Sequence, residues 1–299
     1  MRILIAGWQG QVAQALVSAA AARPEITAVA IGRPALDLCR PASVATALSD
    51  GKPDVIINTA AFTAVDQAED EPEAAAALNA EGARLIAREA ERCGAVIIHL
   101  STDYVFDGEK AAPYTPDDPT NPQSVYGRTK RDGELAVADE AARHLIVRTA
   151  WVHSATGKNF VKTMLALADT RDALNVVADQ HGCPTYAPHL ADALLSMAVQ
   201  AVAKPVSDDA WGIYHAAGTG ETTWAELATE TFSVSKDLGG SHATVTGIAT
   251  SDYPTKAKRP RNSRLDCSKL GTAFGVTLPA WQDGVRLCVK ALVSREADA

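Results

Sequence analysis

Short apolar runs alternate with longer segments of helical pattern through the first half of the chain. Between the runs, segments rich in Ala, Leu, Glu and Arg favour helix. Because the apolar runs carry almost no polar residues, they predict strands of a parallel sheet that helices bury on both faces. The expected strands are residues 2–6, 28–31, 54–58, 95–100 and 144–149, and the expected helices are residues 11–22, 41–50, 73–93 and 126–143.

The regular alternation weakens after Thr149, where turn-rich segments such as residues 181–185 and 236–241 become frequent. We therefore predict an α/β fold: a doubly wound, Rossmann-like parallel sheet with a smaller C-terminal α+β lobe. We place the first domain at residues 1–153 and the lobe mainly at residues 154–299, and we expect some segments of the lobe to return to the sheet. Such a fold binds its ligand at the carboxyl ends of the strands.

Composition narrows the class of protein. The 299 residues are 47% apolar and 21% charged, which suits a globular chain with a sizeable core. The net charge of -8 argues against a nucleic-acid partner. The five cysteines form no C-x-x-C pair, so they indicate neither a zinc site nor a disulfide framework. No apolar run reaches the ~20 residues of a membrane helix, and residues 3–6 are too short a run for a leader. We expect a cytoplasmic protein without a membrane partner.

The first strand leads into Gly7-Trp-Gln-Gly-Gln-Val-Ala13, directly before a helical segment. Small residues permit a tight turn there, and a helix N-terminus offers free N–H groups to a pyrophosphate. A plain Gly-rich turn is the alternative, but the strand-turn-helix placement favours a dinucleotide site. Residues 1–153 would then be an NAD(P)-binding domain, and the lobe would bind the substrate.

The ends of the second and third strands refine the expected cofactor. Arg33 stands where NAD-preferring folds place an acid, so it favours NADPH, with NADH as an alternative donor. Asp37 and Leu38 would flank the adenine. The small residues of segment 58–63 would let the backbone pass along the ribose and nicotinamide. A surface arginine and an ordinary strand end are the alternative interpretations.

Tyr126 and Lys130 are spaced to share one helix face, where an ammonium can stabilise developing phenolate charge. A free phenol has a pKa of about 10, so it needs such a neighbour to exchange protons near neutral pH. Alone, the spacing is typical of a solvated helix face. Thr102, at the end of the fourth strand, could hydrogen-bond a substrate carbonyl that Tyr126 protonates, although strand-end hydroxyls also form turns.

These motifs occur in the order found in extended short-chain dehydrogenase/reductases, which the chain resembles. It resembles the dTDP-4-dehydrorhamnose reductase family more narrowly. That narrower match rests on segments spread over nearly the whole chain: Gly10-Gln-Val, Ala64-Val-Asp66, Ser101-Thr-Asp-Tyr-Val-Phe-Asp-Gly108, Arg148-Thr-Ala-Trp-Val152, Asn159-Phe160, Asp179-Gln-His-Gly-Cys-Pro-Thr185 and Arg259-Pro-Arg-Asn-Ser-Arg-Leu265.

The resemblance implies three sets of site residues. The catalytic set is Thr102, Tyr126 and Lys130. The cofactor set adds to Tyr126 and Lys130 the residues Gly7, Gln9, Gly10, Gln11, Val12, Arg33, Asp37, Leu38, Ala60, Ala61, Phe62 and Thr63. The substrate set is Val65, Thr102, Asp103 and Trp151. From its sequence alone, Trp151 could instead belong to the core. The basic segment 256–264 could hold a nucleotide diphosphate or be a solvated loop.

The implied reaction is reduction of the C4 keto group of dTDP-4-dehydro-L-rhamnose by NAD(P)H, with a small nucleotide sugar as partner. No histidine pair has metal spacing, so we expect no metal. Some proteins of similar fold form dimers bridged by a metal that carboxylates of the first helix bind, but residues 14–16 carry no acid here, so we leave monomer or homodimer open. Alternatives are another nucleotide-sugar 4-ketoreductase, a 4-epimerase, or a non-catalytic regulatory subunit like that of methionine adenosyltransferase. A 4,6-dehydratase fits poorly, because Tyr104 replaces the acid that would follow Asp103.

Overall fold

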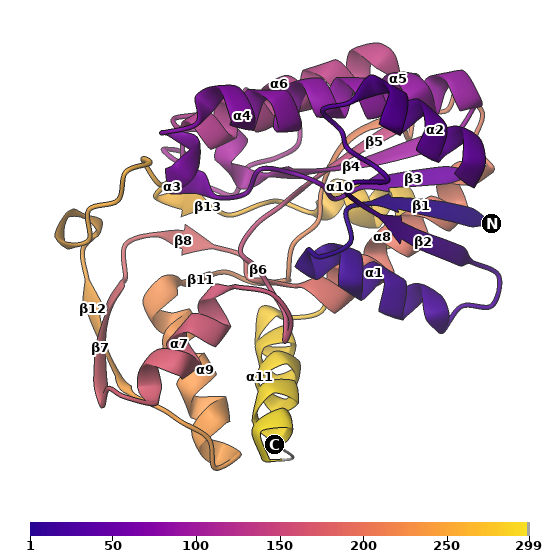
Figure 1. Ribbon diagram of the computed structural model, residues 1–299. Helices are drawn as coiled ribbons and strands as arrows, with labels where there is room; N and C mark the ends of the chain where they lie inside the picture. Colours follow the sequence, from indigo (N-terminus) through magenta and orange to yellow (C-terminus); the bar gives the residue numbers. More distant parts are fainter. Residues whose placement is uncertain (298–299) are drawn as a thin grey trace.

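Six parallel strands form the main sheet of the computed structural model, which describes residues 1–297 (Figure 1). Their order is β2-β1-β3-β4-β5-β10, so the chain first adds a strand on one side of β1 and then continues on the other side. This reversal makes the carboxyl ends of β1 and β3 a topological switch point, where open α/β sheets bind ligands. The strands are β1 (Arg2–Ala6), β2 (Thr27–Ile31), β3 (Val55–Asn58), β4 (Val96–Thr102), β5 (His144–Thr149) and β10 (Gly212–His215).

Helices cover both faces of the sheet. Alternate residues of β1 enter different cores: Ile3 and Ile5 pack in the core on one face of the sheet, while Leu4 and Ala6 pack in the core on the other face. The prediction of a doubly wound α/β fold is therefore confirmed. One face carries α1 (Gln11–Ala21), α8 (Ala187–Val202) and α10 (Ser268–Phe274), and the other carries α2 (Pro41–Gly51), α5 (Gly82–Cys93) and α6 (Val125–Glu140).

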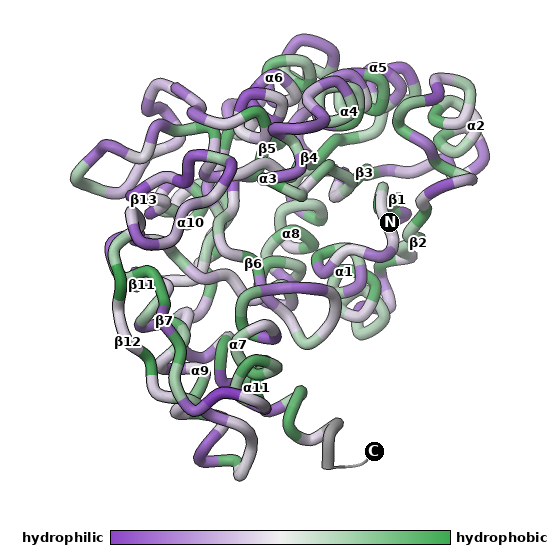
Figure 2. The backbone as a smooth tube through the Cα atoms, turned by 60° about the vertical axis from the view of Figure 1, so that its left-hand side comes forward, coloured by the Kyte–Doolittle hydropathy of each residue, from purple (hydrophilic) through white to green (hydrophobic). Residues whose placement is uncertain are grey.

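The helix expected at residues 73–93 is one helical run with a π turn inside it. The run comprises α4 (Pro72–Ala76), the π turn η1 (Ala77–Glu81) and α5. In α5 the buried residues Ala83, Ile86, Ala87 and Ala90 recur at helical spacing. Figure 2 accordingly shows hydrophobic and hydrophilic residues alternating along this helix. Gly94, with a φ of 74°, ends it in the left-handed region.

The expectation that every strand is buried on both faces is wrong for β2. This strand lies at the edge of the sheet and pairs only with β1 among the described residues. Its Thr27 is exposed, and Val29 keeps 53% of its surface accessible. An apolar sequence alone does not distinguish an edge strand from a central one, because the difference lies in which neighbours the fold supplies.

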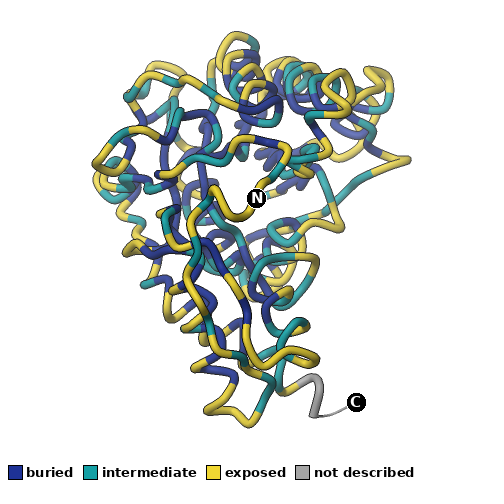
Figure 3. Tube along the Cα trace, turned by 90° about the vertical axis from the view of Figure 1, so that its left-hand side faces the viewer, coloured by how far each residue is buried: buried dark blue, intermediate teal, exposed yellow. Residues whose placement is uncertain are grey.

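The rest of the second half forms a smaller body, at the lower left of Figure 1. Helices α9 and α11 pack together there, and α9 begins with a capping box between Thr223 and Glu226. Its elements are β6 (Val152–His153), α7 (Phe160–Ala168), β7 (Ala173–Val177), β8 (His181–Gly182), β9 (Thr185–Tyr186), β11 (Thr222–Thr223), α9 (Trp224–Asp237), β12 (Thr244–Ile248), η3 (Thr250–Asp252), β13 (Asn262–Ser263) and α11 (Trp281–Ala297). Figure 3 shows buried residues in the interior of both parts and exposed ones on the outer loops.

Three elements from beyond residue 153, namely β10, α8 and α10, belong to the main sheet or pack on it. Strand β10 pairs with β5, and α8 packs in one core with α1. The exact division into two domains stays a prediction. In the part of the chain that the structure describes, no helix is both long and apolar enough to span a bilayer.

A buried ion pair joins α6 to β5 beside the predicted site. Arg148 and Glu134 keep only 2% and 3% of their side-chain surface accessible, and two bonds of 2.8 and 2.7 Å join them. The guanidinium also donates to Pro116 O and lies over the Phe106 ring. Removing one partner leaves an uncompensated buried charge. The pair therefore helps fix the position of the helix that carries Tyr126 and Lys130.

We expect Glu134→Leu or Arg148→Met alone to lower the free energy of unfolding by about 3–5 kcal/mol, because each strands the opposite charge. The double variant should lose much less than the sum. The exposed pair Arg286 and Asp283 is the control, with an expected cost of about 1 kcal/mol or less. Urea unfolding of the natural protein, the three variants and the control measures these values. Additive losses at the buried pair would contradict the coupling.

Candidate active site

The turn after β1 leaves free space at the N-terminus of α1. Gly7 has a φ of 102°, and a Cβ there would lie 2.7 Å from Thr59 Oγ1, so only glycine fits. A Cβ on Gly10, by contrast, would meet nothing within 4 Å. Gly10 is the N-cap of α1 and supplies no side-chain cap, so the first N–H groups of the helix are free to bind an anion. The arrangement fits a pyrophosphate.

Gln11 links this turn to the second lobe. Its Oε1 accepts hydrogen bonds of 2.9 Å from Ser154 Oγ and Asn159 Nδ2. The amide side chain is therefore directed at the segment after β6, and contact with a cofactor would have to come from its backbone. Gln9 and Val12, from the same turn, stay predictions.

The turn after β2 carries the residues that were predicted to bind the adenosine end of the cofactor. Arg33 is exposed. The half-exposed Trp8 covers Gly32 so closely that a Cβ on Gly32 would lie 2.1 Å from Trp8 Cδ1. The Asp37 carboxylate accepts a bond from Cys39 N, which holds the turn before α2. Leu38 is buried in the core beneath α5, so its side chain does not face an open site.

A buried asparagine connects the loop after β3 to α6. Asn79, in the π turn, accepts a hydrogen bond from Phe62 N and donates one to Phe62 O. It also donates to Thr129 Oγ1 at 3.0 Å. This places the predicted segment of Ala60, Ala61, Phe62 and Thr63 beside α6. In the sequence, Asn79 was recognisable only as a polar amide in an Ala-rich helix.

Helix α6 approaches the end of β4 closely. A Cβ on Gly127 would lie 2.2 Å from Tyr104 O, so a larger residue would displace the helix. The Ser124 side chain caps the helix by accepting from Gly127 N. Tyr126 then meets the Tyr104 ring edge-on at a centroid distance of 5.5 Å. The predicted pair Tyr126 and Lys130 therefore reaches the ligand-binding edge of the sheet.

Lys130 is almost wholly buried, with 2% of its surface accessible. Its Nζ donates to Leu100 O at 2.7 Å and lies 3.4 Å from His99 Nε2. Burial lowers the pKa of Lys130 to about 8, and the charge of Glu134 opposes this shift. Burial, and then the charge of Lys130, lower the pKa of His99 far enough that the imidazole is neutral. His99 was not among the predicted site residues.

Thr102, Asp103 and Tyr126 form a hydrogen-bonded set at the end of β4. Thr102 Oγ1 donates to Asp103 Oδ1 at 3.0 Å and also forms a hydrogen bond with the Tyr126 phenol. Burial raises the pKa of Tyr126, and the bond to Thr102 opposes the shift. The Lys130 amine donates its hydrogen bond to Leu100 O.

The Asp103 carboxyl is itself unusual. Burial raises its pKa to about 6, while hydrogen bonds from Ser263 and Thr102 act in the opposite direction. Its Oδ2 is buried without a hydrogen-bond partner among the described residues. A buried unpaired oxygen is costly, and the hydroxyl of a sugar substrate would satisfy it.

Trp151 lies where the predicted substrate pocket begins, in a strained conformation. Its φ is 49°, and its ring stacks on Trp224 at a centroid distance of 3.5 Å. A Cβ on Gly182 would come within 2.4 Å of the indole. The ring is therefore held between Gly182 and Trp224, and such strain is characteristic of functional sites. Val65, at the start of α3 (Val65–Ala68), is partly buried.

Several charges of the basic segment 256–264 are paired within the protein. Lys256 binds Asp70, and Arg259 binds Asp66 at 2.9 Å. The backbone N–H of Ala257 also donates to Asp66. These contacts fasten the segment to the region of α3, so it spans from the second lobe to the main sheet. Its predicted role with a diphosphate stays open.

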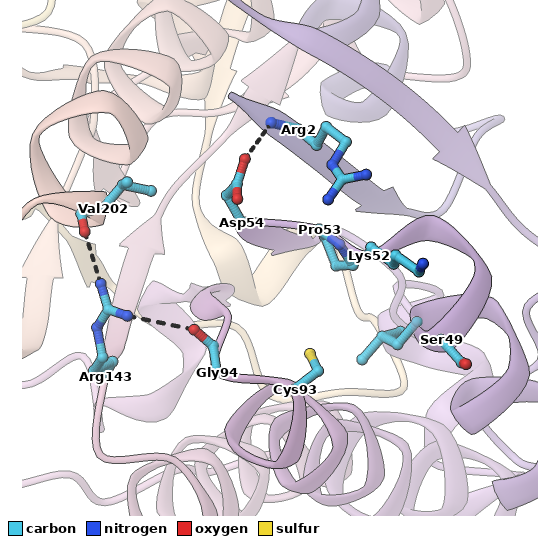
Figure 4. A pocket seen from close by; sticks show the side chains of 10 residues that line it. Arg2, Ser49, Lys52, Pro53, Asp54, Cys93, Gly94, Arg143 and Val202 are labelled. Atoms are coloured by element: carbon cyan, nitrogen blue, oxygen red, sulfur yellow. Dashed lines mark hydrogen bonds between the residues drawn. The ribbon is translucent and has the colours of Figure 1, made fainter.

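A cavity of about 360 Å³ lies at the opposite, amino edge of the sheet (Figure 4). Arg143 there donates to Gly94 O and Val202 O, at the C-terminal ends of α5 and α8. Cations suit such ends, because the helix dipole makes them negative. None of the predicted site residues lines this cavity, so we do not assign the reaction to it. Among the described residues, no group of three or more His, Cys, Asp or Glu side chains could hold a metal ion.

Comparison with known proteins gives consistent matches. The family model described as RmlD substrate binding domain matches residues 1–294. A dTDP-4-dehydrorhamnose reductase from Sinorhizobium fredii is 48% identical over 299 residues, which are 100% of both chains. A structure of this reductase from Clostridium acetobutylicum has a TM-score of 0.89 and 36% identity, covering 98% of this chain and 99% of that one. The Bacillus anthracis structure, in complex with NADP, has a TM-score of 0.89 and 31% identity over 97% and 99%.

We expect Gly127→Ala to lower the free energy of unfolding by about 1–3 kcal/mol, because the new methyl group must push α6 away from Tyr104 O. Gly271→Ala in α10 is the matched control, since its Cβ would have only ordinary contacts at 3.6 Å and beyond. Urea unfolding of both variants checks the difference. Equal stability of the two would show that the close approach is unimportant.

Proposed function

The chain belongs to the dTDP-4-dehydrorhamnose reductase family, and on that premise we propose that it reduces the C4 keto group of dTDP-4-dehydro-L-rhamnose to give dTDP-L-rhamnose. The observation that carries the proposal is the meeting of the Thr102 hydroxyl and the Tyr126 phenol at the carboxyl end of β4, with the buried Lys130 amine on the same helix. This is the position where the doubly wound fold presents a ligand.

The residues at this edge fit a nicotinamide dinucleotide. The open N-terminus of α1 at Gly10 can take the pyrophosphate, and the exposed Arg33 can reach a 2′-phosphate. NADPH, when bound, supplies the hydride. We assign NADPH as the preferred donor and NADH as the alternative, supported by Arg33 and by the NADP-bound relative.

The protein's own groups supply the proton and orient the carbonyl. Addition of a hydride to C4 leaves an alkoxide, and Tyr126 donates its phenolic proton to that oxygen. Thr102 can hydrogen-bond the same oxygen only after its hydroxyl turns away from Asp103. The unpaired Oδ2 of Asp103 can accept a hydroxyl of the sugar. Trp151, stacked on Trp224, would form a wall of the sugar pocket.

Other properties stay predictions. A nucleotide sugar is the partner we propose, and monomer or homodimer remain open. The free thiols of all five cysteines are compatible with the predicted cytoplasmic location.

The reaction is tested with the keto sugar made in situ from dTDP-glucose, supplied with NADPH or NADH. We expect stoichiometric oxidation of the cofactor, faster with NADPH, and a product identified as dTDP-L-rhamnose. Product formed without net oxidation would indicate an epimerase. Absence of turnover with both cofactors would remove the proposal.

We expect Tyr126→Phe to lower kcat by about 10²–10⁴-fold, because the variant lacks the proton donor. Affinity for NADPH, measured by fluorescence titration, should stay within about twofold. Tyr253→Phe is the control, because Tyr253 is exposed and directly follows η3, and this variant should keep full activity. A fully active Tyr126→Phe variant would contradict the assigned role.

A further inference from the structure

Three buried polar side chains form a chain of contacts behind Tyr126. Asn58 on β3, His99 on β4 and Lys130 on α6 keep 1%, 1% and 2% of their surface accessible. Asn58 Nδ2 lies 3.0 Å from His99 Nδ1, and His99 Nε2 lies 3.4 Å from Lys130 Nζ. Both ring nitrogens of His99 are therefore in contact with a neighbouring side chain.

The hydrogen bonds fix which nitrogen of His99 carries the proton. Asn58 Oδ1 accepts from Ala60 N at 3.2 Å, so the NH₂ group of the amide faces His99 Nδ1. An amide NH₂ can only donate, and Nδ1 must therefore accept. A neutral imidazole has one donor and one acceptor nitrogen, so the proton is on Nε2, facing Lys130.

This tautomer discriminates between the two protonation states of Lys130. An ammonium has three donors and no acceptor, so it would place an N–H against the N–H of His99. The neutral amine has a lone pair that can accept from Nε2. Leu100 O accepts from either form, because both retain an N–H. The contact with His99 thus favours the neutral amine relative to the ammonium.

We propose that His99, held by Asn58, is a positioning residue that acts through Lys130: it makes the amine able to release and regain a proton near neutral pH. The consequence for turnover rests on the proposed reductase function. After Tyr126 has protonated the C4 oxygen, its phenolate must regain a proton, and in this proposal the ammonium of Lys130 is the source of that proton. Lys130 is then the neutral amine that His99 accommodates, and it regains its proton from solvent.

The charged and titratable groups around Lys130 are consistent with this role. On its own helix they are Tyr126 and Glu134, and the charge of Glu134 favours the ammonium. Glu134 is itself paired with Arg148 of β5, which weakens its effect on the amine. Strand β4 presents His99, and β3 presents an uncharged amide. Among these groups, His99 is the one whose Nε2–H faces Lys130 and disfavours the ammonium form.

The tautomer can be measured directly by ¹⁵N NMR of the full-length, histidine-labelled protein, with and without NADP⁺. We expect His99 to be neutral at neutral and alkaline pH, with its proton on Nε2 and Nδ1 unprotonated. The His99→Leu variant assigns the signal by its absence. A proton on Nδ1, or an imidazolium in this range, would overturn the proposal. This result does not depend on turnover, so it separates the proposal from the proposed function.

Asn58→Asp should reverse the tautomer, because a carboxylate accepts a proton from Nδ1 and leaves the lone pair of Nε2 facing Lys130. The Nε2 lone pair then favours the ammonium, so Lys130 loses its proton at higher pH. In the pH profile of kcat/KM, which reports on groups of the free enzyme, we expect the alkaline limb to move up by about one pH unit. His144→Leu, at a histidine of β5 that contacts Ala141 O outside this chain of contacts, is the control and should leave the limb in place.

A new carboxylate could also act on Lys130 directly through its charge. In a His99→Leu background, Asn58→Asp should therefore lose most of its effect on the alkaline limb. An undiminished shift without the imidazole, or an unmoved limb in the single variant, would show that His99 does not act through Lys130. If Asn58→Asp fails to fold, the NMR measurement on the natural sequence still decides the proposal.

Discussion

Burial of the Lys130 amine against the end of β4 is the constraint on which the site depends. A buried cation needs partners, and Leu100 O provides the hydrogen bond. That contact requires α6 to lie so close to the chain after β4 that position 127 has room only for glycine. With α6 held there, Tyr126 reaches Thr102 at the edge of the sheet. One close helix approach therefore brings the hydroxyl and the phenol together.

The two parts of the chain are joined around this edge by side chains rather than by sequence proximity. Gln11, at the start of α1, bonds Ser154 and Asn159 beyond β6. On the other side, the pairing of Arg259 with Asp66 fastens the basic segment to the sheet domain. These contacts join the two parts of the chain beside the switch point of the sheet, where open α/β sheets bind ligands.

The sequence predicted the features that are local. Apolar periodicity located the strands of the first domain, and motif order identified the family, because strand burial and turn chemistry are encoded within a few neighbouring residues. Features that depend on distant partners were missed. The edge position of β2 leaves Val29 exposed, the stack of Trp151 on Trp224 joins residues far apart in sequence, and His99 is buried beside Lys130 only because β4 and α6 pack together. Residue spacing along the sequence does not predict such contacts.

At this edge of the sheet, we propose, C4 of the keto sugar receives a hydride from NADPH while Tyr126 supplies the proton. The most direct measurement uses NADPH that carries deuterium at the transferred position, with the product analysed by NMR. We expect one deuterium at C4 of the product sugar and one NADP⁺ formed for each product molecule. A product without deuterium at C4, or one formed without net oxidation of NADPH, would contradict the claim.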